Sequence, residues 1–155
     1  MKKVFVIVSV VALTLIILAA ASFNYISFQG RQLDASSKAY VDKNIPIIIS
    51  NWAEEELQKR ASAELLKASN NDQRQQLHLL FSKLKQLGKF QNYEGCKGES
   101  NTLFNYTNFR VTKTAHYTAS GNFQNGPAEI TIGLVQRNGQ WQIFSFYVKS
   151  PILLK

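Results

Sequence analysis

A run of uncharged, mostly apolar residues from Val4 to Phe23 constrains this chain more than any other feature. A helix needs about 20 such residues to cross a hydrocarbon core about 30 Å thick. A water-soluble domain has little use for a helix that is hydrophobic on every side. Lys2 and Lys3 precede the run, so the positive-inside rule predicts a cytoplasmic N-terminus and an external location for the rest of the chain.

The sequence is consistent with two fates for this segment. Ala19-Ala20-Ala21 satisfies the small-x-small rule of signal peptidase, and cleavage there would release a soluble product that begins at Ser22. The apolar run, however, is as long as the longest signal-peptide cores. The aromatic residues Phe23, Tyr25 and Phe28 also suit a membrane interface. We therefore favour an uncleaved anchor over residues 1–28, followed by a linker over 29–33.

Helical periodicity dominates the next part of the chain. Asp34, Ser36 and Ser37 are candidate N-caps of a first helix, and Pro46 predicts a kink or a restart. Ser62 is a candidate cap for a further turn. Apolar residues then fall on one helical face between Gln73 and Leu87, with Gly88 as the C-cap. The predicted helical segments are 34–45, 47–60, 63–67 and 73–87.

Beyond Gly88 the apolar period changes from 3.6 to 2, which indicates strands. Asn125-Gly126 and Asn138-Gly139 are typical two-residue hairpin turns. Strands are predicted over 89–99, 111–123, 128–134 and 141–148. Helices followed by an antiparallel meander make residues 34–151 one α+β domain.

The last strand is predicted to be apolar on both faces. Simple alternation places Phe144, Phe146 and Val148 on one face, and Trp141, Ile143 and Tyr147 on the other. Only one face can meet the domain's own core. The other is expected to be covered by a helix, by lipid or by a partner, which would be a second copy of the chain or an envelope protein bound through the sheet.

Charge and composition exclude several classes of function. The 18 Lys and Arg exceed the 10 Asp and Glu, for a formal charge of +8, but the cations are dispersed among acids rather than clustered. Nucleic-acid binding is therefore not expected. The single cysteine, Cys96, forms no intrachain disulfide, and its role is undetermined. Two histidines and one cysteine without ligand spacing predict no metal site and no cofactor.

The chain resembles uncharacterised bacterial proteins of the cystatin-like, or nuclear-transport-factor-two-like, fold that carry an N-terminal membrane segment. The resemblance lies in LDASSKAYVDKNIP, NWAEEELQKRASAELL, LGKF and YTASGNFQNGPAEITIGLVQRNGQWQIFSFYVKSP, which together span most of residues 33–151. It implies about three helices packed on a curved antiparallel sheet of about four strands, often around an apolar cavity. It also implies a single-pass protein of the bacterial inner membrane with its domain in the periplasm, or a soluble periplasmic protein if the segment is cleaved.

Enzymes of this fold place an Asp or His in the cavity, often beside a tyrosine. Here Asp34, Asp42 and Asp72 fall in helix-start or loop contexts, and His116 lies on the polar side of its strand. His78 is expected on a helix flank, and Cys96 lacks a partner set. The aromatic residues Trp52, Tyr93, Tyr117 and Trp141 are expected in the core rather than around a pocket. No catalytic residue is predicted, and no ligand-binding residue is identified.

Three functions remain open at this stage. The favoured one is a non-enzymatic, membrane-tethered periplasmic interaction or ligand-binding domain. One alternative is a small isomerase or hydrolase that uses the fold's apolar cavity, for which the strands offer Glu94, Glu99, Glu129 and His116. The other is a scaffold subunit of an envelope assembly.

Overall fold

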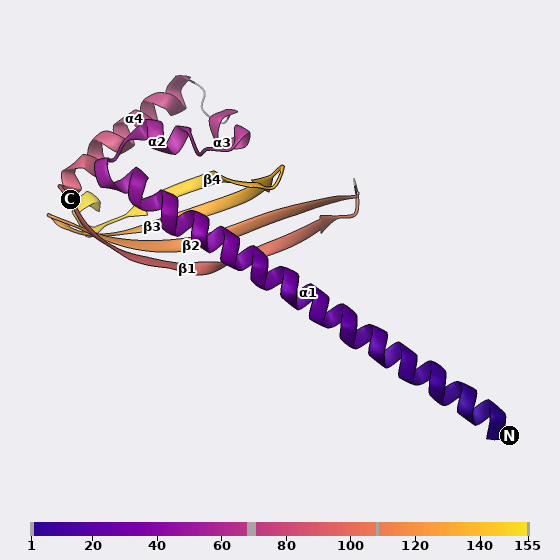
Figure 1. Ribbon diagram of the computed structural model, residues 1–155. Coiled ribbons are helices and arrows are strands. Elements are labelled where there is room, and N and C mark those ends of the chain that lie inside the picture. The colour runs from indigo at the N-terminus through magenta and orange to yellow at the C-terminus, as the bar shows by residue number, and fades with distance from the viewer. Residues whose placement is uncertain (1, 68–70, 108, 155) are drawn as a thin grey trace. The chain divides into compact units, whose positions relative to one another are not determined.

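The structure is a computed structural model. It describes residues 2–67, 71–107 and 109–154, except for the side chains of residues 2–12, 19–27, 71–74, 76 and 154. The chain divides into two compact units, residues 1–33 and residues 34–155. Figure 1 shows the second unit as an antiparallel sheet covered by helices, so the chain has the predicted α+β class.

The first helix, α1, extends over Lys2–Asn51 and contains Pro46 in its interior. The predicted helix start near Asp34 and the predicted restart at Pro46 are therefore wrong. An interior proline costs a helix about 3 kcal/mol. Ile45 and Ile48 flank it and are fully buried, and each contributes roughly 1.5–3 kcal/mol by leaving water. Burial on both sides of the proline outweighs its cost.

Among the residues that the structure describes, no helix is both long and apolar enough to cross a membrane. Most of the predicted span, residues 4–12 and 19–23, lies outside the residues whose side chains are described.

Three shorter helices follow α1. They are α2 (Glu54–Gln58), α3 (Ala63–Lys67) and α4 (Asn71–Leu84), and a 3-10 turn, Lys85–Leu87, extends α4. The Ser62 hydroxyl accepts a hydrogen bond from the Leu65 amide, which confirms it as the cap of α3. Gly88, with φ +79°, ends the 3-10 turn in a conformation that suits glycine, which confirms the predicted C-cap.

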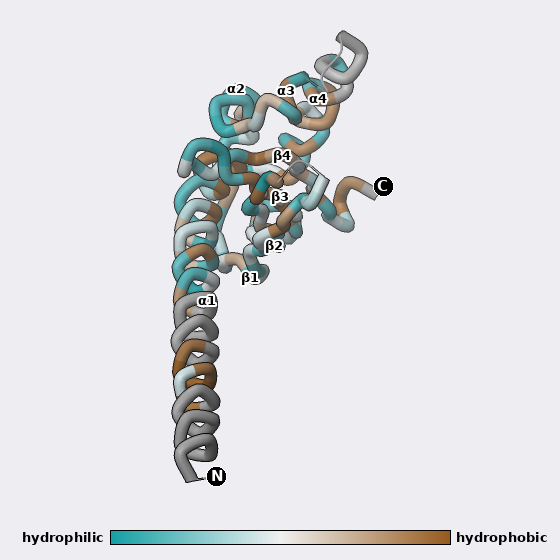
Figure 2. The backbone as a smooth tube through the Cα atoms, turned by 90° about the vertical axis from the view of Figure 1, so that its right-hand side faces the viewer, coloured by the Kyte–Doolittle hydropathy of each residue, from teal (hydrophilic) through white to brown (hydrophobic). Residues whose placement is uncertain are grey.

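The sheet has four antiparallel strands in the order β1-β2-β3-β4. They are β1 (Phe90–Asn105), β2 (Arg110–Phe123), β3 (Gly126–Arg137) and β4 (Gln140–Lys149), and a 3-10 turn, Pro151–Leu154, follows. The predicted Asn138-Gly139 turn is confirmed, whereas the hairpin between β2 and β3 turns at Gln124-Asn125, one residue earlier than predicted, because Gly126 already pairs with Phe123. Figure 2 shows hydrophobic stretches along β3 and β4. β1 is longer than predicted and contains two irregularities near Asn92 and Gly95.

Residues 34–51 of α1 run antiparallel to β1 across one face of the sheet. Asp34 contacts Ser100, Asp42 contacts Cys96, and Ile49 lies against Gly121. Ser100 precedes the turn between β1 and β2, whereas Gly121 lies at the other end of the β1–β2 hairpin. The start of the second unit is therefore at the same end of the sheet as the β1–β2 turn.

A bulge in β4 reorganises the last strand. Gly133 pairs with Ser145 and Leu134 with Ile143, so Phe144 is an extra residue. Because of it, Ile143 lies on the same face as Phe146 and Val148, which pair with Ile132 and Ile130. The inner face then carries Trp141, Ile143, Phe146 and Val148, and the outer face carries Phe144 and Tyr147. The predicted division of these residues between the two faces is wrong, because alternation reverses at the bulge, but aromatic residues do occur on both faces.

Candidate functional site

Four polar side chains form a hydrogen-bonded cluster between α1 and β1. Asp42 accepts hydrogen bonds from Tyr93 Oη at 2.8 Å, from Cys96 Sγ at 3.2 Å and from Lys38 Nζ at 2.5 Å. Lys38 and Asp42 are one turn apart on α1, and Tyr93 and Cys96 are three residues apart on the edge strand β1. We call these four residues the Asp42 cluster.

The ionisation of the Asp42 cluster follows from its surroundings. Burial alone would raise the pKa of Asp42, but the hydrogen bonds from Lys38, Tyr93 and Cys96 bring it below its ordinary value. Burial and the bond to Asp42 raise the pKa of Tyr93 and raise the pKa of Cys96 to about 11. At neutral pH the cluster therefore holds a carboxylate, a neutral phenol and a neutral thiol. A protonated thiol is a poor nucleophile. This arrangement therefore suits a structural contact that holds α1 on β1 better than it suits covalent catalysis.

Further polar contacts hold α1 along the same face of the sheet. Asp34 Oδ1 accepts hydrogen bonds from the Ser100 amide at 2.7 Å and from its hydroxyl at 2.5 Å. The hydroxyls of Ser37 and Tyr117 lie 2.9 Å apart. Trp141 Nε1 donates to Ser36 Oγ at 3.1 Å. These bonds satisfy polar groups at a buried interface and set the register of the helix on the sheet.

The structure brings together residues that the sequence kept apart. Asp34 and Asp42 are interior helix residues that face the sheet, not residues of helix starts or loops. Their spacing of two helical turns was the available signal, because it places both carboxylates on one face. No local feature of the sequence indicated that Tyr93 would be the partner of Asp42. The side chain of Asp72 lies outside the described residues.

The ionisable strand residues singled out as candidate catalysts are all exposed. They are Glu94, Glu99, His116 and Glu129. Glu94 accepts a hydrogen bond from Asn122, and the His116 ring makes an edge contact with Phe144 on the outer face. His78 is exposed on α4, as predicted, with its Nδ1 atom 3.4 Å from a Glu54 carboxylate oxygen.

A groove of about 490 Å³ lies between α2 and α4. Trp52 and Phe81 contribute its aromatic part, and Glu54, His78 and Lys85 contribute ionisable groups. Trp52 is 3% exposed, stacks on Phe123 at 5.2 Å and has a left-handed φ of +45°. Its buried Nε1 has no hydrogen-bond partner among the described residues. Trp52, Tyr117 and Trp141 are buried, so their predicted core placement is confirmed, whereas Tyr93 is half-buried.

Exposed hydrophobic side chains gather at the turn between β1 and β2. Tyr106 and Phe109 are 80% and 81% exposed, and the Phe104 ring lies 4.8 Å from that of Tyr106 and 6.3 Å from that of Phe109. Leu103 and Val111 are exposed on the adjoining strands. We call these five residues the hairpin tip.

Within the described part of the chain, no group of three or more His, Cys, Asp and Glu residues is arranged to hold a metal ion. Comparisons of the chain with models of protein families, with curated protein sequences and with solved structures found no significant match.

Proposed function

We propose that this chain is a non-enzymatic, membrane-tethered interaction or ligand-binding domain of the cystatin-like fold, held at a bacterial inner membrane and facing the periplasm. The apolar run from Val4 to Phe23 behind Lys2 and Lys3 supports the tether and its direction. The antiparallel meander covered by helices supports the fold assignment.

The observation that carries the proposal is the way α1 occupies the sheet. Catalysis in a cystatin-like cavity needs an acid or base that projects into open space beside a bound substrate. Here the carboxylates of Asp34 and Asp42 on that face are engaged with Ser100, Tyr93 and Cys96. The carboxylates and imidazole of the strands point instead to exposed positions. This pairing favours a domain that works through its surface.

The groove between α2 and α4 is the ligand-contacting surface in this proposal. It combines a partly aromatic lining with two carboxylates, an imidazole and an ammonium group, which is the mixture typical of small binding sites. It lies at the C-terminal end of α1, beside Asn51. Asp34, where the domain begins, is at the other end of this part of the helix.

The tether is tested on the full chain expressed with its own N-terminus. We expect the intact mass of the uncleaved protein, recovery in membranes after alkaline extraction, and digestion of the domain by protease added to spheroplasts. A mature species that begins at Ser22, or a domain shielded from external protease, would contradict the proposal.

The binding role is tested with a photoreactive amino acid placed in the full chain in cells. Gln58 and Ser82 are exposed groove positions, and Thr131 is an exposed control on the outer sheet face. We expect adducts of one common mass from both groove positions and none from Thr131. Absence of adducts, or equal adducts at all three positions, would overturn the groove as the binding surface.

A further inference from the structure

The hairpin tip shows three features that a solvated turn does not require. Its aromatic rings form a contiguous cluster while remaining largely exposed. Phe109 has a φ of +52°, a left-handed conformation that is rare for a bulky residue. No Asp or Glu occurs between Ser100 and Ala128, whereas Arg110 and Lys113 lie in this stretch. An exposed apolar cluster beside basic residues indicates a binding surface.

We propose that the hairpin tip inserts into the headgroup region of the anionic bilayer that holds the tether. This inference rests on the membrane tether of the proposed function. Tyrosine and phenylalanine suit the interface between headgroups and acyl chains, and Arg and Lys are attracted to anionic lipid phosphates. The occupant is thus a lipid surface rather than a protein partner.

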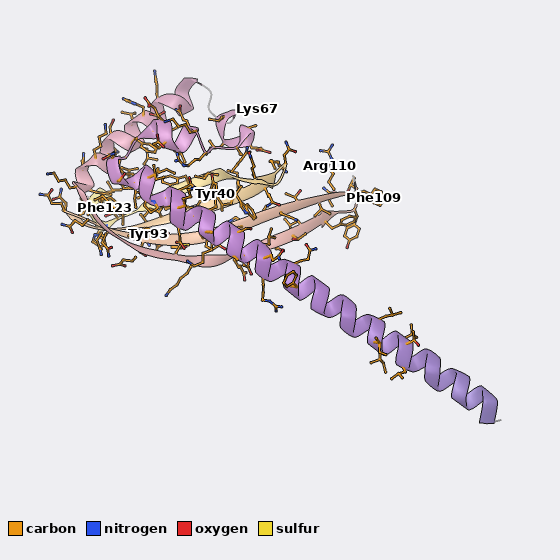
Figure 3. All side chains as sticks on the ribbon, viewed as in Figure 1. Tyr40, Lys67, Tyr93, Phe109, Arg110 and Phe123 are labelled. Atoms are coloured by element: carbon orange, nitrogen blue, oxygen red, sulfur yellow. The ribbon has the colours of Figure 1, made fainter. Side chains whose placement is uncertain are left out.

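The position of the tip favours the bilayer. Asp34 begins the second unit and is bonded to Ser100, which precedes the β1–β2 turn. Figure 3 shows Phe109 and Arg110 at one end of the sheet, and Tyr93 and Phe123 toward the other. The tip is therefore at the end of the domain where the tether joins it.

The test uses the full chain reconstituted in vesicles of phosphatidylethanolamine and phosphatidylglycerol at about three to one, an anionic surface. Cys96 is replaced by Ser, and an environment-sensitive fluorophore is attached at T107C beside the tip. Q91C is the matched control, exposed at the end of β1 farthest from the turn that carries Thr107. Vesicle flotation in the same samples reports the tether.

We expect the T107C label to shift to the blue and to be quenched by brominated lipid, with neither effect at Q91C. The double variant Y106S/F109S should lose both signals, and vesicles of phosphatidylcholine alone should weaken them. Protein that floats while its T107C label stays in water overturns tip insertion and leaves the tether intact. Protein that does not float overturns both. A blue shift that grows with protein-to-lipid ratio, without quenching by lipid, would assign the tip to a second copy and overturn the lipid proposal.

Discussion

Tyr93 on the edge strand β1 donates a 2.8 Å hydrogen bond to Asp42 on α1, and this carboxylate also accepts the Cys96 thiol. The three groups come from two elements that are far apart in the sequence, so their contact exists only when α1 is seated on the sheet. A half-buried carboxylate with several donors is costly to leave unpaired. The Asp42 cluster therefore couples the position of α1 on the sheet to the ionisation of Asp42 and to the reactivity of the Cys96 thiol.

The first prediction concerns Asp42 and acid stability. Its pKa is lowered in the folded chain relative to the ordinary value of 3.8, so it stabilises the fold above that pH and loses the contribution as pH falls through the folded pKa. We expect D42N to lower the free energy of unfolding at pH 7 by about 1–2 kcal/mol, after allowance for partial exposure. Its unfolding should also depend less on pH below about 4.

Urea unfolding from pH 3 to pH 7 measures this effect. E64Q is the matched control, because Glu64 pairs with Arg137 at 2.7 Å on the exposed surface, where solvent screens the attraction between the two charges. If D42N unfolds with the same pH dependence as the wild type, the carboxylate has no stabilising role.

The second prediction concerns the reactivity of Cys96. Burial and the bond to Asp42 raise its pKa to about 11, so roughly one thiol in a thousand is ionised at pH 8. Alkylation of the folded chain by iodoacetamide should be at least about 100-fold slower than that of a free cysteine.

D42N should accelerate the alkylation of Cys96, because an acceptor and a negative charge are removed. Y93F should not, because the Tyr93 hydrogen bond lowers the pKa of Cys96. Mass spectrometry over a pH series measures the rates, and equal rates in both variants would contradict the assignment.

The third prediction concerns the unpartnered indole of Trp52. Because its Nε1 is buried without an acceptor among the described residues, W52F removes a polar group that gains nothing from folding. We expect W52F to change the free energy of unfolding by less than about 1.5 kcal/mol. W52A, which removes the ring that stacks on Phe123, should cost about 3–5 kcal/mol. Thermal and urea unfolding of the two variants separates these outcomes, and an equal loss would show that the indole nitrogen has a partner in solution.

The fourth prediction compares two glycines in the sheet. A Cβ at Gly98 would lie 2.0 Å from the His116 carbonyl oxygen, a backbone atom of the paired strand. A Cβ at Gly133 would meet the side-chain ends of Ser145 and Phe144, which can rotate away. We expect G98A to destabilise the domain by more than about 2 kcal/mol and G133A to cost less. Urea unfolding of both variants tests the order, and a reversed order would contradict the close approach of β1 to β2.

Local signals predicted much of the sheet and the ends of two helical segments. Asn138-Gly139 specifies a tight hairpin through its own backbone preference, and Gly88 specifies the end of the 3-10 turn in the same way. The other hairpin was predicted to within one residue of its turn at Gln124-Asn125. Ser62 caps α3 through a bond to Leu65 only three residues away. Each of these features depends on residues within one turn, so the sequence is sufficient to predict it.

The features that the sequence did not predict depend on contacts between distant residues. The Phe144 bulge follows from the pairing of β4 with β3, and it changes which apolar residues of β4 share a face. The helix passes Pro46 because Ile45 and Ile48 are buried by the domain. The Asp42 cluster joins residues more than 50 positions apart. Periodicity reports which face of an element is apolar, but not which partner that face meets.

The fifth prediction uses the left-handed conformation of Phe109. Asparagine tolerates this backbone region better than phenylalanine, and a side chain that is 81% exposed loses little packing when replaced. We therefore expect F109N to raise the free energy of unfolding by about 1 kcal/mol. V111T, an exposed substitution on the next strand, should stay within about 0.5 kcal/mol of the wild type.

In vesicles, F109N should nevertheless weaken quenching of the T107C label by brominated lipid. These two results together would show that the strained conformation of Phe109 lowers folding stability and is retained because it promotes membrane contact. If F109N is less stable than the wild type, then Phe109 supports the turn itself, and its exposure has a structural cause.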